Sequence, residues 1–175
     1  MSISIAGIEF WNELTEEIKD SSNVNQFKIK LKKEMLNKYK NEENAINLGR
    51  RNQELVCFRD IFPAAPYHFL VIPREHIVSC RSLNKKHISL VERMVELGRA
   101  VLLDQGITNM NDVRLGFHQF PFISVSHLHL HVLAPASQIS QAMMFKFTPG
   151  SDSFITVSPA GCSCLLIHST FHRSL

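Results

Sequence analysis

The sequence predicts one domain in which short β-strands are combined with a long helix. In residues 126–133, histidine alternates with aliphatic residues for three cycles, which is typical of a strand with two different faces. Residues 84–105 carry apolar side chains at helical spacing, with Asn84 in an N-cap position and Gly106 where a helix would stop. A length of 175 residues fits a single domain with an appendage.

The composition, 45% hydrophobic and 20% charged, is typical of a soluble globular protein. The formal net charge of +3 is too small to indicate nucleic-acid binding by itself. No apolar run is long enough to cross a membrane. The first residues, Met1 to Ile8, lack the basic region of a signal peptide. We therefore expect a protein that acts away from membranes.

Three segments differ in their patterns. Residues 1–43 predict a loosely packed helical extension, with helices at 9–19 and 24–40. The second of these is basic and amphipathic, and we interpret it as a solvated face rather than a membrane or nucleic-acid surface. Residues 44–157 form the main domain, and 158–175 an irregular tail. Limited proteolysis should therefore leave a core of the main domain.

Strand-like runs divide the main domain. Pro73 ends one of them, and this run places His68 on the same face as two aliphatic residues. Gly98 lies inside the apolar stripe of the helix, where it permits close packing against a sheet or a partner molecule. The predicted strands are 45–48 and 54–58, joined by a turn, followed by 67–72, 113–118 and 154–157.

The four cysteines form no disulfide framework, because two are far apart and two are one residue apart. A reducing compartment, the cytoplasm and also the nucleus, fits this usage. A zinc set in the tail is a lesser alternative, since the Cys-x-Cys spacing is tighter than that of zinc fingers. Its members would be Cys162, Cys164, His168 and His172.

The three alternating histidines predict a functional site, because valine or isoleucine would fill a strand face better. On one strand their rings would follow one another at roughly 6–7 Å. One interpretation is a zinc site, although residues 117–135 contain no Asp or Glu to complete it. The other is covalent catalysis, in which the central His129 attacks phosphorus. His127 and His131 would then flank the nucleophile, with the Ser124 hydroxyl near the phosphate or the leaving group.

The motif His127-Leu-His129-Leu-His131-Val-Leu resembles the signature of the histidine triad (HIT) family. Two upstream segments, Cys57-Phe-Arg-Asp60-Ile61 and His68-Phe-Leu-Val-Ile-Pro73-Arg-Glu-His76-Ile, also resemble that family and stand in the same order. The resemblance covers roughly residues 44–135. It implies an α+β fold with a five-stranded antiparallel sheet and a long helix, usually as a homodimer.

The resemblance also implies an activity and a set of site residues. It implies hydrolysis of adenosine 5′-phosphoramidates and related AMP conjugates through an adenylated His129, without a cofactor or a metal ion. Asp60 and Ile61 would hold the ribose and purine, and Ser124 and His131 would lie near the phosphate. His68, His127 and His131 would complete the catalytic histidines.

Departures from the family pattern leave two alternatives open. The N-terminal Cys-x-x-Cys of many relatives is absent, and Phe122-Ile123 replaces Gly-Gln before Ser124. The aprataxin branch suggests a hydrolase of adenylated DNA, although the tail here is shorter than the zinc finger of that branch. A nucleotide-binding scaffold with little catalysis is the other alternative, and a binder has no need of the His129 nucleophile.

Overall fold

The computed structural model describes residues 26, 29–34, 54–119, 123 and 125–157. Residues 1–41 and 42–175 form two separate compact units, and residues 29–34 of the first unit are helical. The rest of the predicted extension, the strand at 45–48 and the proposed zinc residues of the tail lie outside the described residues. Within the described parts, no helix combines the length and apolarity needed to span a bilayer.

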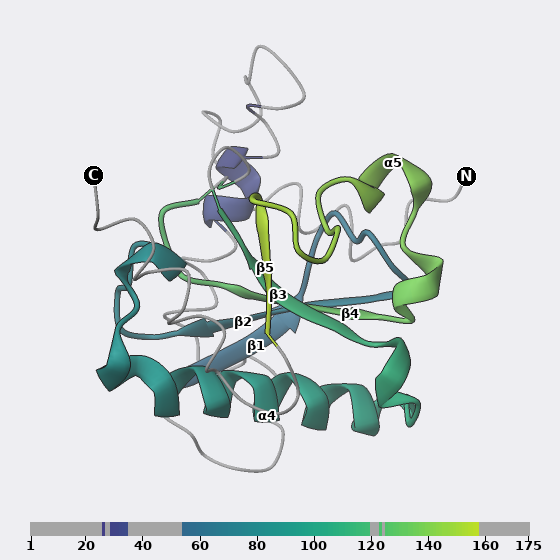
Figure 1. Ribbon diagram of the computed structural model, residues 1–175, viewed down its shortest axis with the longest axis horizontal. Helices are drawn as coiled ribbons and strands as arrows, with labels where there is room; N and C mark the ends of the chain where they lie inside the picture. Colours follow the sequence, from purple (N-terminus) through teal and green to yellow (C-terminus); the bar gives the residue numbers. More distant parts are fainter. Residues whose placement is uncertain (1–25, 27–28, 35–53, 120–122, 124, 158–175) are drawn as a thin grey trace. The chain divides into compact units, whose positions relative to one another are not determined.

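The second unit contains a five-stranded antiparallel sheet with the strand order β1-β2-β4-β3-β5 (Figure 1). This sheet and its long helix confirm the predicted α+β fold. The strands are β1 (Leu55–Arg59), β2 (Tyr67–Pro73), β3 (Arg114–His118), β4 (Leu130–Ala134) and β5 (Phe154–Thr156).

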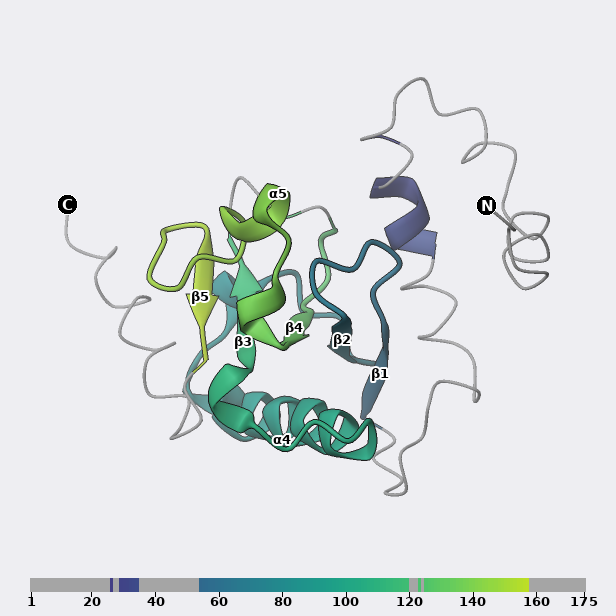
Figure 2. The ribbon, with the colours of Figure 1, turned by 90° about the vertical axis from the view of Figure 1, so that its right-hand side faces the viewer.

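Helix α4 (Ile88–Asp104) runs across one face of the sheet, as Figures 1 and 2 show. A 3-10 turn, Lys85–His87, precedes it, and the Asn84 side chain caps that turn by accepting from the Lys86 amide. Gly106 follows the helix with φ +79°, a left-handed conformation that glycine adopts without strain. The predicted helix is therefore confirmed, with its first turn in the tighter form.

The predicted apolar stripe of α4 packs on this face of the sheet. A Cβ atom on Gly98 would lie 2.6 Å from Cγ2 of Val132 in β4. Glycine is thus required at this position by the protein's own sheet. The buried helix residues of the core are Leu90, Val91, Met94, Val95, Val101 and Leu102.

The opposite face of the sheet carries a second, smaller apolar cluster and the histidines. Phe147 and Phe154 pack there with Leu133 of β4. Figure 2 shows the short helix α5 (Gln141–Met144) on the side of the sheet away from α4. Further members of this cluster are Ala64, Ala65, Ala136 and Ile139.

The histidine strand is shorter than the sequence predicted. Strand β4 begins at Leu130, so His127 and His129 precede it, and the expected strand start at Ser126 is wrong. The Leu128 amide donates to the Ile77 carbonyl at 2.6 Å instead of joining the sheet. Residues 127–131 are all buried, and Leu128, like Leu130, belongs to the hydrophobic core that packs against α4.

Candidate active site

His68 and His131 form the buried base of the candidate site. In the register of β2 and β4, His68 faces Leu133 and Leu70 faces His131, so the two histidines are diagonal neighbours on one sheet face. Nε2 of His68 lies 2.9 Å from Nδ1 of His131, and their side chains are almost fully buried. The strand pairing thus brings together two histidines that are 63 positions apart in the sequence.

The backbone amide of Ala64 fixes the direction of the bond between these rings. It donates to Nδ1 of His68 at 3.1 Å, so the hydrogen of neutral His68 lies on Nε2. That Nε2–H donates to Nδ1 of His131, and neutral His131 then carries its hydrogen on Nε2. His131 therefore offers an N–H group to a substrate.

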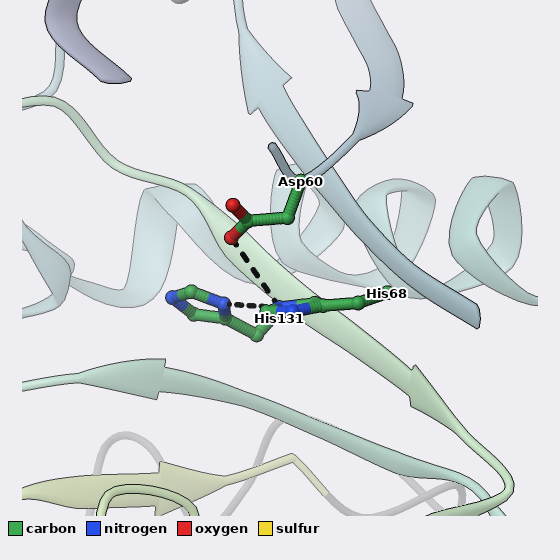
Figure 3. A group of neighbouring side chains, drawn as sticks. All are labelled: Asp60, His68 and His131. Atoms are coloured by element: carbon green, nitrogen blue, oxygen red, sulfur yellow. Dashed lines mark hydrogen bonds and ion pairs between the residues drawn. The ribbon is translucent and has the colours of Figure 1, made fainter. Parts of the chain in front are cut away.

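Asp60 supplies a negative charge next to this pair. Its Oδ2 lies 3.5 Å from Nε2 of His68, and Oδ1 accepts from the Phe62 amide at 3.0 Å. Figure 3 shows the two contacts of the His68 ring, one to Asp60 and one to His131. Residues 117–135 contain no carboxylate, but the fold brings Asp60 from the end of β1 to the buried histidine pair.

His129 is held in the orientation that a nucleophile needs. Its Nδ1 lies 2.7 Å from the backbone oxygen of His127. A carbonyl oxygen can only accept, so the hydrogen of neutral His129 lies on Nδ1 and the lone pair on Nε2. The His129 ring lies edge-to-face with the His131 ring at a centroid distance of 5.0 Å. The nucleophilic nitrogen is thus placed next to the buried histidine pair.

The ring of His127 faces away from this pair. Its Nε2 lies 2.8 Å from the Pro73 carbonyl oxygen, and its Nδ1 lies 3.0 Å from Nδ1 of His76. The rings of His76 and His127 are stacked, with centroids 5.3 Å apart and planes 22° from parallel. The ring nitrogens of His127 therefore contact the last residue of β2 and the segment that follows it.

His118 of β3 is a site residue that the sequence analysis missed. Gly116 pairs with His131, and His118 lies two residues further along β3 on the same face. The His118 ring lies edge-to-face with that of His131, with centroids 4.5 Å apart. The same-face alternation of Gly116 and His118 is the sequence signal that would have found it.

A shallow hollow opens next to His129. Burial raises the pKa of the Cys80 thiol to about 11, which keeps this lining residue protonated and uncharged at neutral pH. Other lining residues are Val78, Ser79, Phe117, His118, Ile123, Val125, His127 and Leu128.

The buried histidine pair and Asp60 form a candidate metal site. Three ligand atoms of Asp60, His68 and His131 lie within 4.8 Å of one another, close enough for one ion. A metal on Nε2 of His68 would require the ring hydrogen on Nδ1. That nitrogen faces the Ala64 N–H, and two hydrogens cannot occupy one hydrogen bond. The donor set therefore does not fit a metal ion.

Ile61 and Ser124 are the remaining predicted site residues. Ile61 is half-buried and follows Asp60 directly in the turn after β1. Ser124 lies outside the described residues, so its expected place near the phosphate stays a prediction. The roles assigned to the other site residues also stay predictions, whereas their positions are those given above.

A family model and several known proteins match this chain. A model described as "Scavenger mRNA decapping enzyme C-term binding" matches residues 33–145. The chain is 44% identical over 115 residues to adenosine 5′-monophosphoramidase HINT3 of Xenopus tropicalis, and the match covers 66% of this chain and 75% of that relative.

Two further similarities are weaker. The chain is 34% identical over 84 residues to aprataxin of Gallus gallus, which covers 48% of this chain and 26% of that protein. The solved structure of Hnt3 is similar with a TM-score of 0.50 and 22% identity, over 74% of each chain. This likeness shows the fold alone.

Proposed function

The chain belongs to the histidine triad family, and on this premise we propose that it hydrolyses adenosine 5′-phosphoramidates at the P–N bond and releases AMP. Its relative of 44% identity is named an adenosine 5′-monophosphoramidase. The observation that carries the proposal is the 2.7 Å hydrogen bond between His129 Nδ1 and the His127 carbonyl, since it leaves the lone pair on Nε2.

The proposed reaction has two steps. Nε2 of His129 attacks phosphorus, the P–N bond breaks, and the leaving amine takes the electron pair together with a proton from solvent. The water that is consumed in the second step returns a proton to solvent. Nδ1 of His129 keeps its hydrogen, and the His127 carbonyl stabilises the positive charge of the adenylated ring. Water then attacks phosphorus, the electron pair returns to Nε2, and AMP leaves. Water is the co-reactant, so no redox cofactor is needed.

The buried pair supplies the charge stabilisation in this proposal. Because His131 accepts at Nδ1 from His68, its Nε2–H is available to a non-bridging phosphate oxygen. Asp60 and Ile61 would hold the ribose and purine, which the place of Asp60 at the end of β1, next to His68, supports. Ser124 would contact the phosphate or the leaving amine.

The test is turnover of an AMP-lysine or AMP-amine conjugate, with AMP release and a covalent protein adduct followed together. His129→Asn should abolish the adduct and lower kcat by about 10⁴–10⁶, while nucleotide binding largely survives. The same substitution outside the site, His87→Asn, is the matched control and should retain turnover. Wild-type turnover in His129→Asn would overturn the proposal.

The alternatives predict other outcomes. An aprataxin-like enzyme would prefer 5′-adenylated DNA in the same assay, and the shorter, less identical aprataxin match does not favour it. A scaffold would show no difference between wild type and His129→Asn. A zinc site would show equal losses at His127, His129 and His131, and added zinc would partly restore activity.

We also propose that the protein is a homodimer of the cytoplasm and nucleus. Leu103 of α4 is 52% exposed, which supports a contact through that helix, although the Gly98 face is occupied by the protein's own sheet. The free thiols of Cys57 and Cys80 support a reducing compartment. Sedimentation at tens of micromolar and imaging of a fluorescent fusion are the measurements, and a monomer at that concentration would contradict the dimer.

A further inference from the structure

The segment that carries the proposed nucleophile is held by the last residue of β2 and the loop after it, rather than by ladder bonds of the sheet. The β2–β4 register extends back only to Leu130, so the residues before it lack these ladder bonds. Two contacts replace the ladder: the Leu128 amide donates to the Ile77 carbonyl, and Nε2 of His127 donates to the Pro73 carbonyl. Residues 73–77 thus form a clamp on residues 127–128.

A third contact of this clamp is made by the exposed side chain of His76. Because Pro73 O can only accept, the hydrogen of neutral His127 lies on Nε2 and its Nδ1 has a lone pair. Nδ1 of His76, 3.0 Å away, must then be the donor. The stacked rings hold this pair in one geometry. His76 therefore completes the hydrogen bonds of the His127 ring.

The orientation of His127 determines that of the nucleophile. The backbone carbonyl of His127 accepts from Nδ1 of His129 and selects the tautomer with the lone pair on Nε2. A rotated or shifted His127 peptide would release that tautomer. A misplacement of about 1 Å is sufficient to cost roughly 100-fold in rate. His76 would therefore affect the reaction indirectly, through His127 and then His129.

We propose that His76 is a positioning residue, which fixes the tautomer and direction of His129 through His127. This inference rests on the proposed function for its kinetic consequence and on the hydrogen bonds of His76 and His127 for its structural one. His76 touches no reacting atom, so its removal should lower kcat and leave KM nearly unchanged.

The test compares two substitutions of His76. His76→Phe keeps a ring for stacking and removes the donor, and it should lower kcat by roughly 10- to 100-fold with KM changed less than about twofold. His76→Asn keeps an amide N–H near the position of Nδ1 and should retain most of kcat. The exposed neighbour Glu75 provides the control, since Glu75→Gln should behave as wild type.

The readout that separates positioning from general damage is the imidazole ¹⁵N spectrum of histidine-labelled protein at about pH 8, where an unperturbed imidazole is neutral. The His129 signals are assigned by their loss in His129→Asn. Wild type should show the Nδ1–H tautomer, and His76→Phe a mixture of tautomers. Unchanged His129 signals together with wild-type kcat in His76→Phe would overturn the inference. Absence of turnover in the wild type would instead refute the proposed function, while the spectra would still test His76.

Discussion

His68 Nε2 and His131 Nδ1 lie 2.9 Å apart, and the Ala64 amide determines which of the two donates. The hydrogen-bond chain therefore runs from the backbone through His68 to His131 and ends on an N–H group. One backbone amide thus disfavours a metal ion on His68 and also directs the N–H group that we propose donates to the substrate phosphate.

The first prediction concerns His68, the middle member of this series of hydrogen bonds. His68→Phe should lower kcat roughly 10- to 100-fold, because His131 loses the donor that selects its tautomer and orientation. Added zinc should not restore activity. The measurement is phosphoramidate turnover, with circular dichroism to confirm folding. Tyr67→Phe, on the same strand, is the control, and a His68→Phe rate equal to that of the control would refute the hydrogen-bond chain.

The second prediction is a pH dependence that arises away from the site. Hydrogen bonds from the Ser137 hydroxyl and amide hold the pKa of Asp112 below its ordinary value. A lowered folded-state pKa contributes stability above about pH 4, and that contribution is lost as the pH falls through the folded value. Ser137→Ala should therefore destabilise the protein near pH 7 and have a smaller effect near pH 2.

The measurement for Ser137→Ala is urea unfolding at both pH values, with the Asp112 carboxyl followed by ¹³C NMR. The pKa of Asp112 should rise toward 3.8 in the variant. Ser82→Ala removes another exposed hydroxyl and should change neither quantity. An equal loss of stability at both pH values would mean that the Ser137 hydroxyl acts independently of the Asp112 charge.

The sequence predicted the elements whose residues repeat with a clear period. The helical stripe around Met94 and the β2 run before Pro73 predict their own structure, because each buries one face against the same core. The His127 and His129 positions were only partly predictable. Leu128 and Leu130 lie in the core as their alternation predicts, but period alone does not show where the hydrogen-bond ladder ends.

Periodic patterns do not predict contacts between segments that are far apart in the sequence. Asp60 reaches His68, and His118 reaches His131, through the turn after β1 and the β3–β4 register. A register depends on the whole sheet, and a shift by one residue would move every side chain to the other face. His76 has no periodic signal at all, since it lies in a loop.

The last prediction tests the close contact of Gly98 with Val132. A methyl group on Gly98 would lie 2.6 Å from Cγ2 of a fully buried, β-branched side chain that has little room to rotate. Overpacking costs about 1–3 kcal/mol, and replacing a helix glycine with alanine returns about 1 kcal/mol. Gly98→Ala should therefore lower the free energy of unfolding by up to about 2 kcal/mol.

Val132→Ala removes the methyl groups that an alanine at position 98 would meet. The double variant should be more stable than the sum of the single changes predicts, by at least about 0.5 kcal/mol, because one change makes room for the other. Ala100→Gly on the exposed side of α4 measures the helix-propensity term by itself. Purely additive changes in the free energy of unfolding would contradict the close contact between Gly98 and Val132. A change in sedimentation with unaltered unfolding would indicate that Gly98 contacts a partner molecule instead of β4.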